Sequence, residues 1–116
     1  MRLVLDACVL FPQGMRAILL DYAVAGGFAP LWSERIAEEW ARAAEAKQGP
    51  EAAAAARAAE ARMRAAFPSG RVTGWEALED AAGLPDAGDA HVIAAARAGG
   101  ADGIVTLNTR DFPLRA

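Results

Sequence analysis

The chain opens with Met1-Arg2-Leu3-Val4-Leu5-Asp6, a short apolar run that ends at a carboxylate. Residues 1–5 predict a buried β-strand, because a continuous apolar run of this length is typical of a strand covered on both faces. An acid that directly follows such a strand lies at the edge of the sheet where α/β proteins gather their ligands. Asp6 is therefore the first candidate for a functional residue.

Apolar periodicity and helix-breaking residues predict the remaining elements. Strands are predicted over residues 28–32, 71–73 and 103–106. Helices are predicted over residues 12–25, 33–47, 51–67, 75–82 and 87–98. Ser33 is the expected N-cap of the second helix. The first helix is expected to turn one face inward that carries Ile18, Leu19 and Tyr22.

The third helix, 51–67, consists almost entirely of Ala, Arg and Glu. It is expected to be well exposed, with only a narrow apolar stripe through Ala52, Ala56, Ala59, Met63 and Phe67. The order of strands and helices predicts a parallel sheet with helices on both faces, an α/β/α fold. At 116 residues the chain is expected to form a single domain over residues 1–116. In such a fold Asp6 and the residues after the last strand share one edge of the sheet.

Composition narrows the class of protein. The lone Cys8 cannot form an internal disulfide and is expected to pack as a small apolar residue, which suits a reducing cytoplasm. No apolar stretch has the length of a membrane helix, and Asp6 interrupts the apolar N-terminus, so a cytoplasmic protein without membrane association is expected. The net charge of −3 argues against strong non-specific binding to nucleic acid.

Asp6 and Glu39 each have two interpretations. Asp6 is either a ligand at the sheet edge or a cap before the first helix. Glu39 lies at the edge of the apolar face of helix 33–47, whereas Glu38 and Glu45 point away from it. Glu39 is therefore the better ligand candidate of the three, although a surface glutamate paired with a neighbouring arginine is the common alternative.

Two acidic clusters follow late in the chain, at residues 85–89 and 106–112. Asp89 projects into the expected buried stripe of its helix, formed by Val92, Ile93 and Ala96, and a buried carboxylate needs a partner such as a cation. Asp86 and Asp89 could instead cap the helix and favour its dipole.

Asn108 and Asp111 follow the last strand, which ends at Thr106, and both offer oxygen to a hard cation. The more common use of Asn and Asp in loops is to fix a turn. His91 is expected on the outward side of its helix, opposite Asp89, as a solvated or hydrogen-bonding residue outside the metal shell.

The four motifs resemble the PIN-domain family, the metal-dependent ribonucleases that include the VapC-type toxins of bacterial toxin–antitoxin pairs. The resembling segments are Leu3–Leu10, Ser33–Trp40, Asp86–Ala96 and Ile104–Pro113. They span nearly the whole chain. Relatives usually continue beyond the Asp-Phe-Pro motif with another strand and helix, whereas this chain ends at Ala116, so a shortened domain with an exposed sheet edge is expected.

The resemblance implies a catalytic set and a metal. Asp6, Glu39 and Asp89 are the implied catalytic acids, and with Asp111 they are the implied ligands of Mg²⁺ or Mn²⁺. Asn108 competes with Asp111 for the fourth position, and Asp86 and Thr106 are secondary candidates. The implied activity is hydrolysis of RNA phosphodiester bonds, with a cation that activates water for in-line attack.

Partners are implied as well: an RNA substrate, an antitoxin protein and a second copy of the chain in a homodimer. Cations on the two middle helices are expected to steer the RNA, namely Arg42, Lys47, Arg57, Arg62 and Arg64. Singly, such arginines more often pair with neighbouring glutamates. The alternative function is a PIN-like module that no longer cleaves and docks or dimerises through exposed apolar residues such as Phe11, Trp32 or Phe112.

Overall fold

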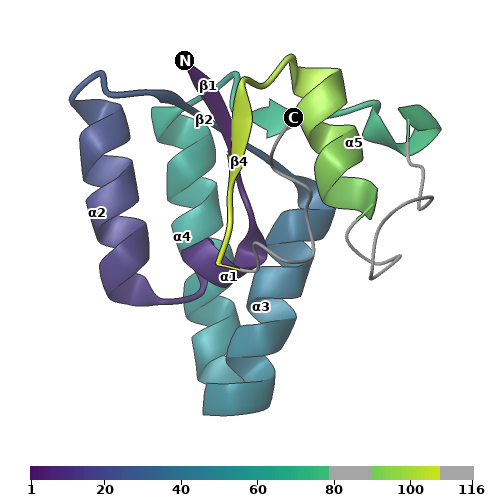
Figure 1. Cartoon of the computed structure of the whole chain (residues 1–116). Coiled ribbons are helices and arrows are strands. Elements are labelled where there is room, and N and C mark those ends of the chain that lie inside the picture. The colour runs from purple at the N-terminus through teal and green to yellow at the C-terminus, as the bar shows by residue number, and fades with distance from the viewer. Residues whose placement is uncertain (79–89, 108–116) are drawn as a thin grey trace.

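The opening apolar run forms a central strand of the molecule. A computed structural model describes residues 1–78 and 90–107. In this part of the chain β1 (Arg2–Leu5), β2 (Ala29–Ser33), β3 (Arg71–Val72) and β4 (Gly103–Val105) form one parallel sheet in the order β3-β2-β1-β4 (Figure 1). Val4 lies opposite Leu31 of β2 and Ile104 of β4, and it is completely buried.

The helices follow the predicted order. They are α1 (Ala7–Leu10), α2 (Gln13–Val24), α3 (Glu34–Gln48), α4 (Pro50–Ala66), the 3₁₀ helix η1 (Trp75–Leu78) and α5 (Ala90–Gly99). The hydroxyl of Ser33 accepts a hydrogen bond from the Ile36 backbone N–H, which confirms it as the N-cap of α3. The single turn α1 was not predicted from the sequence, because four residues are too few to show a helical period in their apolar positions.

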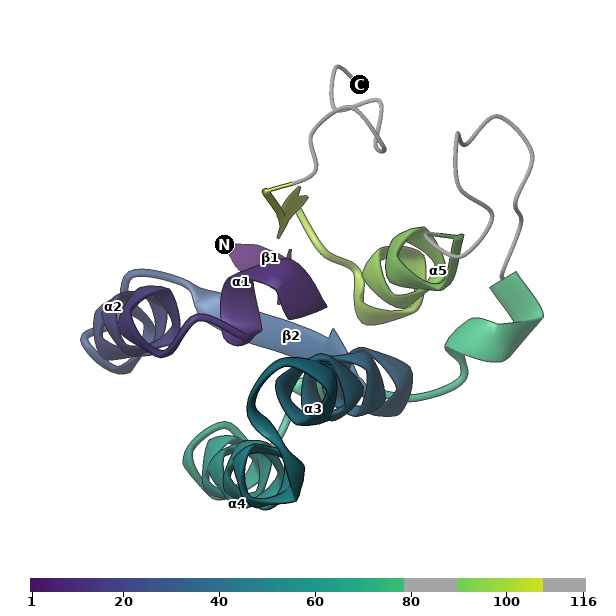
Figure 2. The ribbon, with the colours of Figure 1, turned by 90° about the horizontal axis from the view of Figure 1, so that it is seen from below.

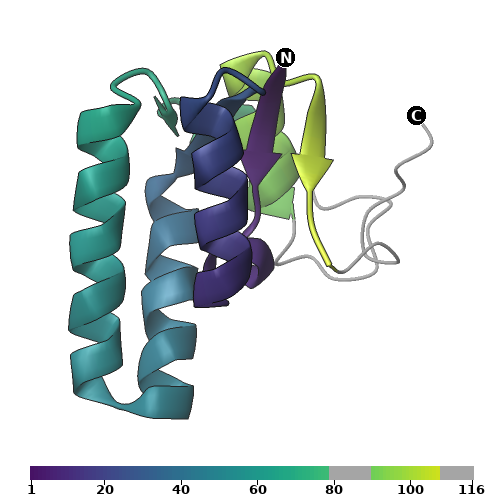
Figure 3. The ribbon, with the colours of Figure 1, turned by 90° about the vertical axis from the view of Figure 1, so that its left-hand side faces the viewer.

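Helices cover both faces of the sheet, as predicted. α2 lies in front of the sheet and α5 behind it in Figure 3. α3 packs against β2 and then continues past the sheet side by side with α4, so that the two form a long antiparallel pair at the carboxyl ends of the strands (Figure 1). Seen from that end, α1, α3 and the start of α5 lie around the edge of the sheet (Figure 2).

Pro30 is tolerated in β2 because of its place in the hydrogen-bond ladder. The Ala29 N–H points to β1, where it donates to the Met1 carbonyl at 2.7 Å. The backbone nitrogen of the next residue, Pro30, therefore points to the opposite side of β2, the side of β3. β3 pairs only with Trp32 and Ser33 on that side. The N–H that proline lacks therefore faces a stretch beyond the end of β3, where no ladder bond is lost.

Two packing predictions were wrong and one was confirmed. Ile18 and Tyr22 of α2 are 71% and 62% exposed, whereas Leu19, the third residue predicted to face inward, packs against the core beside Met15 and Ala23. α4 agrees with the prediction: most of it is exposed, and it buries a narrow stripe that includes Ala56, Ala59 and Met63. Trp32, predicted as an exposed docking residue, is completely buried in β2.

The buried face of α5 also differs from the prediction. Val92 is completely buried, but Ile93 and Ala96 are only partly buried, while Ala94 and Ala95 are fully covered. The reason is that η1 packs on α5 from the side that the sheet leaves open, with Trp75 in contact with Ala94 and Ala95. α5 is therefore covered on two sides. Among the described residues, no helix is both long and apolar enough to cross a membrane.

Candidate metal centre at the carboxyl edge of the sheet

Asp6 is held in place where β1 passes into α1. Its Oδ1 accepts a hydrogen bond of 2.8 Å from the Ala7 backbone N–H, and its Oδ2 accepts one of 2.9 Å from the Thr106 hydroxyl at the end of β4. Only 7% of Asp6 is exposed. Asp6 is thus the N-cap of α1, one of its two predicted interpretations. Oδ2 also accepts a weak hydrogen bond from Cys8 Sγ, whereas Oδ1 keeps a further lone pair for a ligand.

Cys8 takes part in this cluster, which the sequence did not indicate. Its Sγ accepts a hydrogen bond of 3.2 Å from the Leu107 backbone N–H and lies 3.3 Å from the Thr106 hydroxyl oxygen and 3.6 Å from Asp6 Oδ2. The predicted apolar packing of Cys8 against the core is observed as well. The thiol therefore links α1 to the segment after β4 and fixes the surroundings of Asp6.

Glu39 of α3 is bound to the side chain of His91. Glu39 Oε2 lies 2.9 Å from His91 Nε2, and the glutamate side chain is 41% exposed while the histidine side chain is 1% exposed. The prediction that His91 faces outward, away from the site, is wrong. The prediction took this side of α5 to face solvent. η1 covers it instead, with Trp75 next to His91, so His91 is buried.

Asp6 and Glu39 line the same pocket, with a volume of about 510 Å³. Lys47 of α3 and Leu107 line it too, and Phe11 and Cys8 of the β1–α2 region form its remaining wall. The Lys47 ammonium lies 5.8 Å from the centre of the Phe11 ring. Two carboxylates from elements distant in sequence are thus brought to one cavity at the carboxyl edge of the sheet.

The predicted ligand set is only partly visible. Within residues 1–78 and 90–107, no group of three or more His, Cys, Asp or Glu side chains is arranged to hold a metal ion. Asp86, Asp89, Asn108 and Asp111 lie outside the described residues. Asp6 and Glu39 nevertheless suit Mg²⁺ or Mn²⁺, because such cations are commonly held by one or two carboxylates, with water and substrate phosphate completing the shell.

A second pocket, of about 620 Å³, shares Glu39 with the first and is here called the arginine groove. Its charged lining consists of Glu34, Glu38, Glu39 and Glu60 together with Arg35, Arg42, Arg57, Arg64 and Arg71. Three of these arginines were predicted to bind RNA, whereas Arg35 and Arg71 were missed. Arg35 could have been found, since it precedes Glu39 by one helical turn.

The other two predicted RNA-binding cations lie elsewhere. Lys47 lines the pocket of Asp6. Arg62 lies near Arg16, whose pKa is lowered mainly by burial of its guanidinium and further by the charge of Arg62. Arg16 stacks over the Trp40 ring at 4.9 Å and donates to the Leu10 carbonyl.

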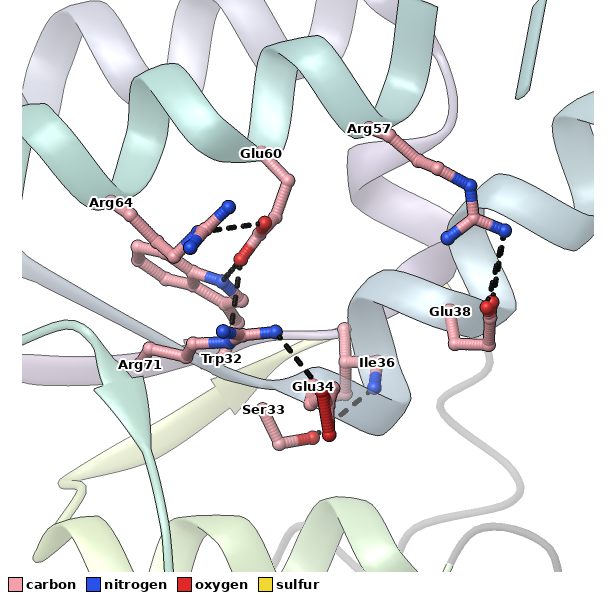
Figure 4. Close-up of polar contacts among 9 residues, drawn as sticks. All are labelled: Trp32, Ser33, Glu34, Ile36, Glu38, Arg57, Glu60, Arg64 and Arg71. Atoms are coloured by element: carbon pink, nitrogen blue, oxygen red, sulfur yellow. Dashed lines mark hydrogen bonds and ion pairs between the residues drawn. The ribbon is translucent and has the colours of Figure 1, made fainter. Parts of the chain in front are cut away.

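Several arginines of the groove are held by glutamates (Figure 4). Buried Glu60 accepts hydrogen bonds from Trp32 Nε1 at 2.9 Å and from Arg64 Nε at 3.0 Å, and Arg71 lies 3.5 Å from it. Arg57 donates to Glu38 at 3.0 Å. These pairs join α3, α4 and β3. Within the described residues no hydrogen bond or ion pair holds Arg42, although its charge helps to lower the pKa of Glu38.

A family model described as PIN domain matches residues 2–110. The chain belongs to the PIN-domain family. No curated protein and no solved structure gave a significant match to it. The parallel sheet in the order β3-β2-β1-β4, with helices on both faces, agrees with this assignment.

Membership in the family places this PIN domain in a nuclease superfamily, whose members are typically hydrolases and generally use divalent metal ions. The pocket that holds Asp6 and Glu39 lies where that chemistry needs carboxylates, at the carboxyl ends of parallel strands.

Proposed function

We propose that this PIN domain is a Mg²⁺- or Mn²⁺-dependent endoribonuclease that hydrolyses phosphodiester bonds. The observation that supports the proposal most strongly is that Asp6 from β1 and Glu39 from α3 line one pocket. A divalent cation between the two carboxylates would offset their mutual repulsion. In the proposal Asp89 and Asp111 complete the shell, and Asn108 competes for the fourth position.

The side chains of the site have distinct proposed roles. Asp6, fixed by the Ala7 N–H and the Thr106 hydroxyl, presents a nearly immobile carboxylate to the cation. Glu39 provides the second oxygen from the opposite wall of the pocket. When bound, the cation supplies Lewis-acid chemistry, in that it activates water and stabilises negative charge on phosphate oxygens.

The arginine groove supports RNA as the substrate. Arg42 lies three residues after Glu39 on α3, on the same side of the helix, and among the described residues no hydrogen bond or ion pair holds its guanidinium. Planar guanidinium groups bind phosphate oxygens in pairs. We propose that Arg42 contacts the phosphate next to the scissile bond, and that the paired Arg57 and Arg64 contribute mainly to the local potential.

The biological role is proposed from the VapC-type resemblance. A cytoplasmic toxin of a toxin–antitoxin pair is the proposed role, with an antitoxin and a second copy of the chain as its partners. Of the predicted docking residues, Phe11 lines the Asp6 pocket and Phe112 lies outside the described residues. The large apolar side chains that α2 exposes are Ile18, Tyr22 and Val24, and such a surface suits contact with another protein.

RNA cleavage with and without Mn²⁺ tests the proposal. Wild type, Asp6→Asn and Asp89→Asn are compared with Asp21→Asn, the same chemical change at an exposed position of α2. We expect metal-dependent cleavage by wild type and by the Asp21 variant, and a loss of at least about 10²-fold in the other two, because each loses a charged ligand. Equal activity in all four would point to a contaminating nuclease. No cleavage by any would favour the non-cleaving docking module.

A further inference from the structure

His91 is a buried polar side chain that the proposed chemistry does not use. It is completely buried near the start of α5, and its ring lies 6.1 Å from the Trp75 ring at an interplanar angle of 57°. Its Nε2 reaches Glu39 Oε2 at 2.9 Å. His91 is the only histidine in the sequence, and Glu39 is its hydrogen-bond partner among the described residues.

The hydrogen bonds assign the tautomer of this ring. A carboxylate only accepts hydrogen bonds, so Nε2 carries the hydrogen that Glu39 receives. Nδ1 is buried and has no hydrogen-bond partner within the described residues. A hydrogen on Nδ1 would thus be buried without an acceptor, which costs more than a buried lone pair. The arrangement therefore favours a ring with hydrogen on Nε2 that points at Glu39.

Glu39 needs such a contact more than Asp6 does. Asp6 has a short side chain with two fixed donors, whereas Glu39 is longer, 41% exposed, and bound through one oxygen. An exposed glutamate that is free to rotate loses rotamer entropy when it binds a cation. The contact with His91 removes part of that freedom in advance and leaves Oε1 without a hydrogen-bond partner among the described residues.

We propose that His91 is a positioning residue that holds the Glu39 carboxylate in the orientation in which it binds the divalent cation. This inference rests on the proposed function in so far as Glu39 is a metal ligand. It couples α5, whose first turn follows the predicted ligand Asp89, to α3, which carries Glu39. Partners that orient a metal ligand typically change metal affinity by about 10- to 100-fold when they are removed.

Binding of Mn²⁺ alone, measured by calorimetry, tests the role without RNA. His91→Gln keeps an N–H donor near the place of Nε2, and His91→Leu has a similar volume without a donor. We expect His91→Leu to bind Mn²⁺ about 10- to 100-fold more weakly than wild type, and His91→Gln to recover most of the affinity. In a Glu39→Gln background, the leucine change should have no further effect. Circular dichroism confirms that the compared variants are folded.

A measurement on the unaltered protein covers the case in which the leucine variant does not fold. Because His91 is the only histidine, its ring ¹H–¹⁵N signals are unambiguous in NMR. We expect Mg²⁺ to shift these signals in a titration whose dissociation constant matches the one that calorimetry with Mg²⁺ gives, and Glu39→Gln to abolish the shift.

The outcomes separate the two proposals. Equal Mn²⁺ affinity in wild type and His91→Leu, or His91 signals that ignore bound Mg²⁺, would overturn the positioning role and leave the nuclease proposal intact. Mn²⁺ binding that depends on His91 without any RNA cleavage would support the positioning role and contradict the nuclease. A wild type that binds no divalent cation would overturn both.

Discussion

Thr106 provides one of the hydrogen-bond donors that hold the Asp6 carboxylate in place. Its hydroxyl donates to Asp6 Oδ2 across the junction of β4 and β1. We expect Thr106→Val, which keeps the shape of the side chain but removes the hydroxyl, to weaken Mn²⁺ binding by about tenfold or more. Thr106→Ser keeps the donor and is the matched control. Equal affinity in the valine and serine variants, measured by calorimetry, would show that the hydroxyl does not support Asp6.

Glu60 is the residue on which the α4 packing depends. It is 6% exposed and accepts hydrogen bonds from Trp32 Nε1 and Arg64. Glu60→Ala leaves the indole N–H of a completely buried tryptophan without its partner, so we expect the free energy of unfolding to fall by about 1–3 kcal/mol. Urea denaturation measures it, with Glu51→Ala, exposed at the start of α4, as control. A Glu60 effect no larger than that of Glu51 would contradict the packing role.

The surroundings of individual residues were the part of the structure that the sequence predicted least well. His91 and Glu60 are both buried against neighbours from other elements, which a single helix does not disclose. One signal was present for His91: residues 90–96 are apolar on every side except for this histidine, and a helix that is apolar all round is typically covered all round. Two partners of Glu60, Trp32 and Arg71, come from other elements and are brought near it only by the sheet.

At the scale of elements, the α3–α4 hairpin depends on Gly49. This residue ends α3 and precedes Pro50 with φ = 95° and ψ = 177°, a conformation that residues with a Cβ rarely adopt. We expect Gly49→Ala to lower the free energy of unfolding by about 1–3 kcal/mol. Gly14→Ala in the first turn of α2, where no atom is within 4 Å of the added Cβ, is the control.

Helix propensity predicts that the Gly14 control is neutral or slightly stabilising, since alanine is the better helix former. Thermal unfolding of the two variants provides the comparison. Equal changes in Tm for the two variants would show that the backbone conformation of Gly49 does not determine the stability of the hairpin.

The same hairpin should respond to pH through Glu38 and Arg57. The hydrogen bond from Arg57, assisted by the charges of Arg57 and Arg42, lowers the pKa of the Glu38 carboxyl from its usual value. A carboxyl whose pKa is lowered by folding stabilises the protein above its unfolded pKa, and the effect is lost as pH falls through its folded pKa. Glu38→Gln should therefore lower Tm slightly at pH 7 and have no effect in acid, where wild type is protonated as well.

Glu51→Gln on α4 is the control for this pH series. A Tm difference between wild type and Glu38→Gln that stays constant from neutral to acidic pH would contradict the ion pair. The effect should also decrease in high salt, because the pair is exposed.

Elements were predictable where a local signal marked their ends. Ser33 and Gly49 mark the limits of α3, and apolar runs without breakers mark β1 and β4. α1 escaped prediction because Asp6 caps a single turn, which has no period to detect. The exposed face of α2 was misjudged because Ile18 and Tyr22 fit an inward helical stripe as well as an outward one, and only tertiary packing decides between them.

At the scale of the whole molecule, the parallel sheet brings the ends of β1, β2 and β4 to one edge, with α3 and the start of α5 beside it (Figure 2). The order of strands and helices was sufficient to predict this edge, because crossover connections leave few alternatives. It was not sufficient to predict the arginine groove, since Arg71 on β3 and Arg64 on α4 meet only after the sheet has formed.

The central claim is that Asp6 and Glu39 hold one divalent cation together. A crystal of the protein soaked in Mn²⁺ tests it directly, because the anomalous signal of manganese locates the ion. We predict one anomalous peak in the pocket, about 2.0–2.3 Å from an oxygen of Asp6 and from an oxygen of Glu39. Manganese bound to either carboxylate alone, or found only outside this pocket, would contradict the claim.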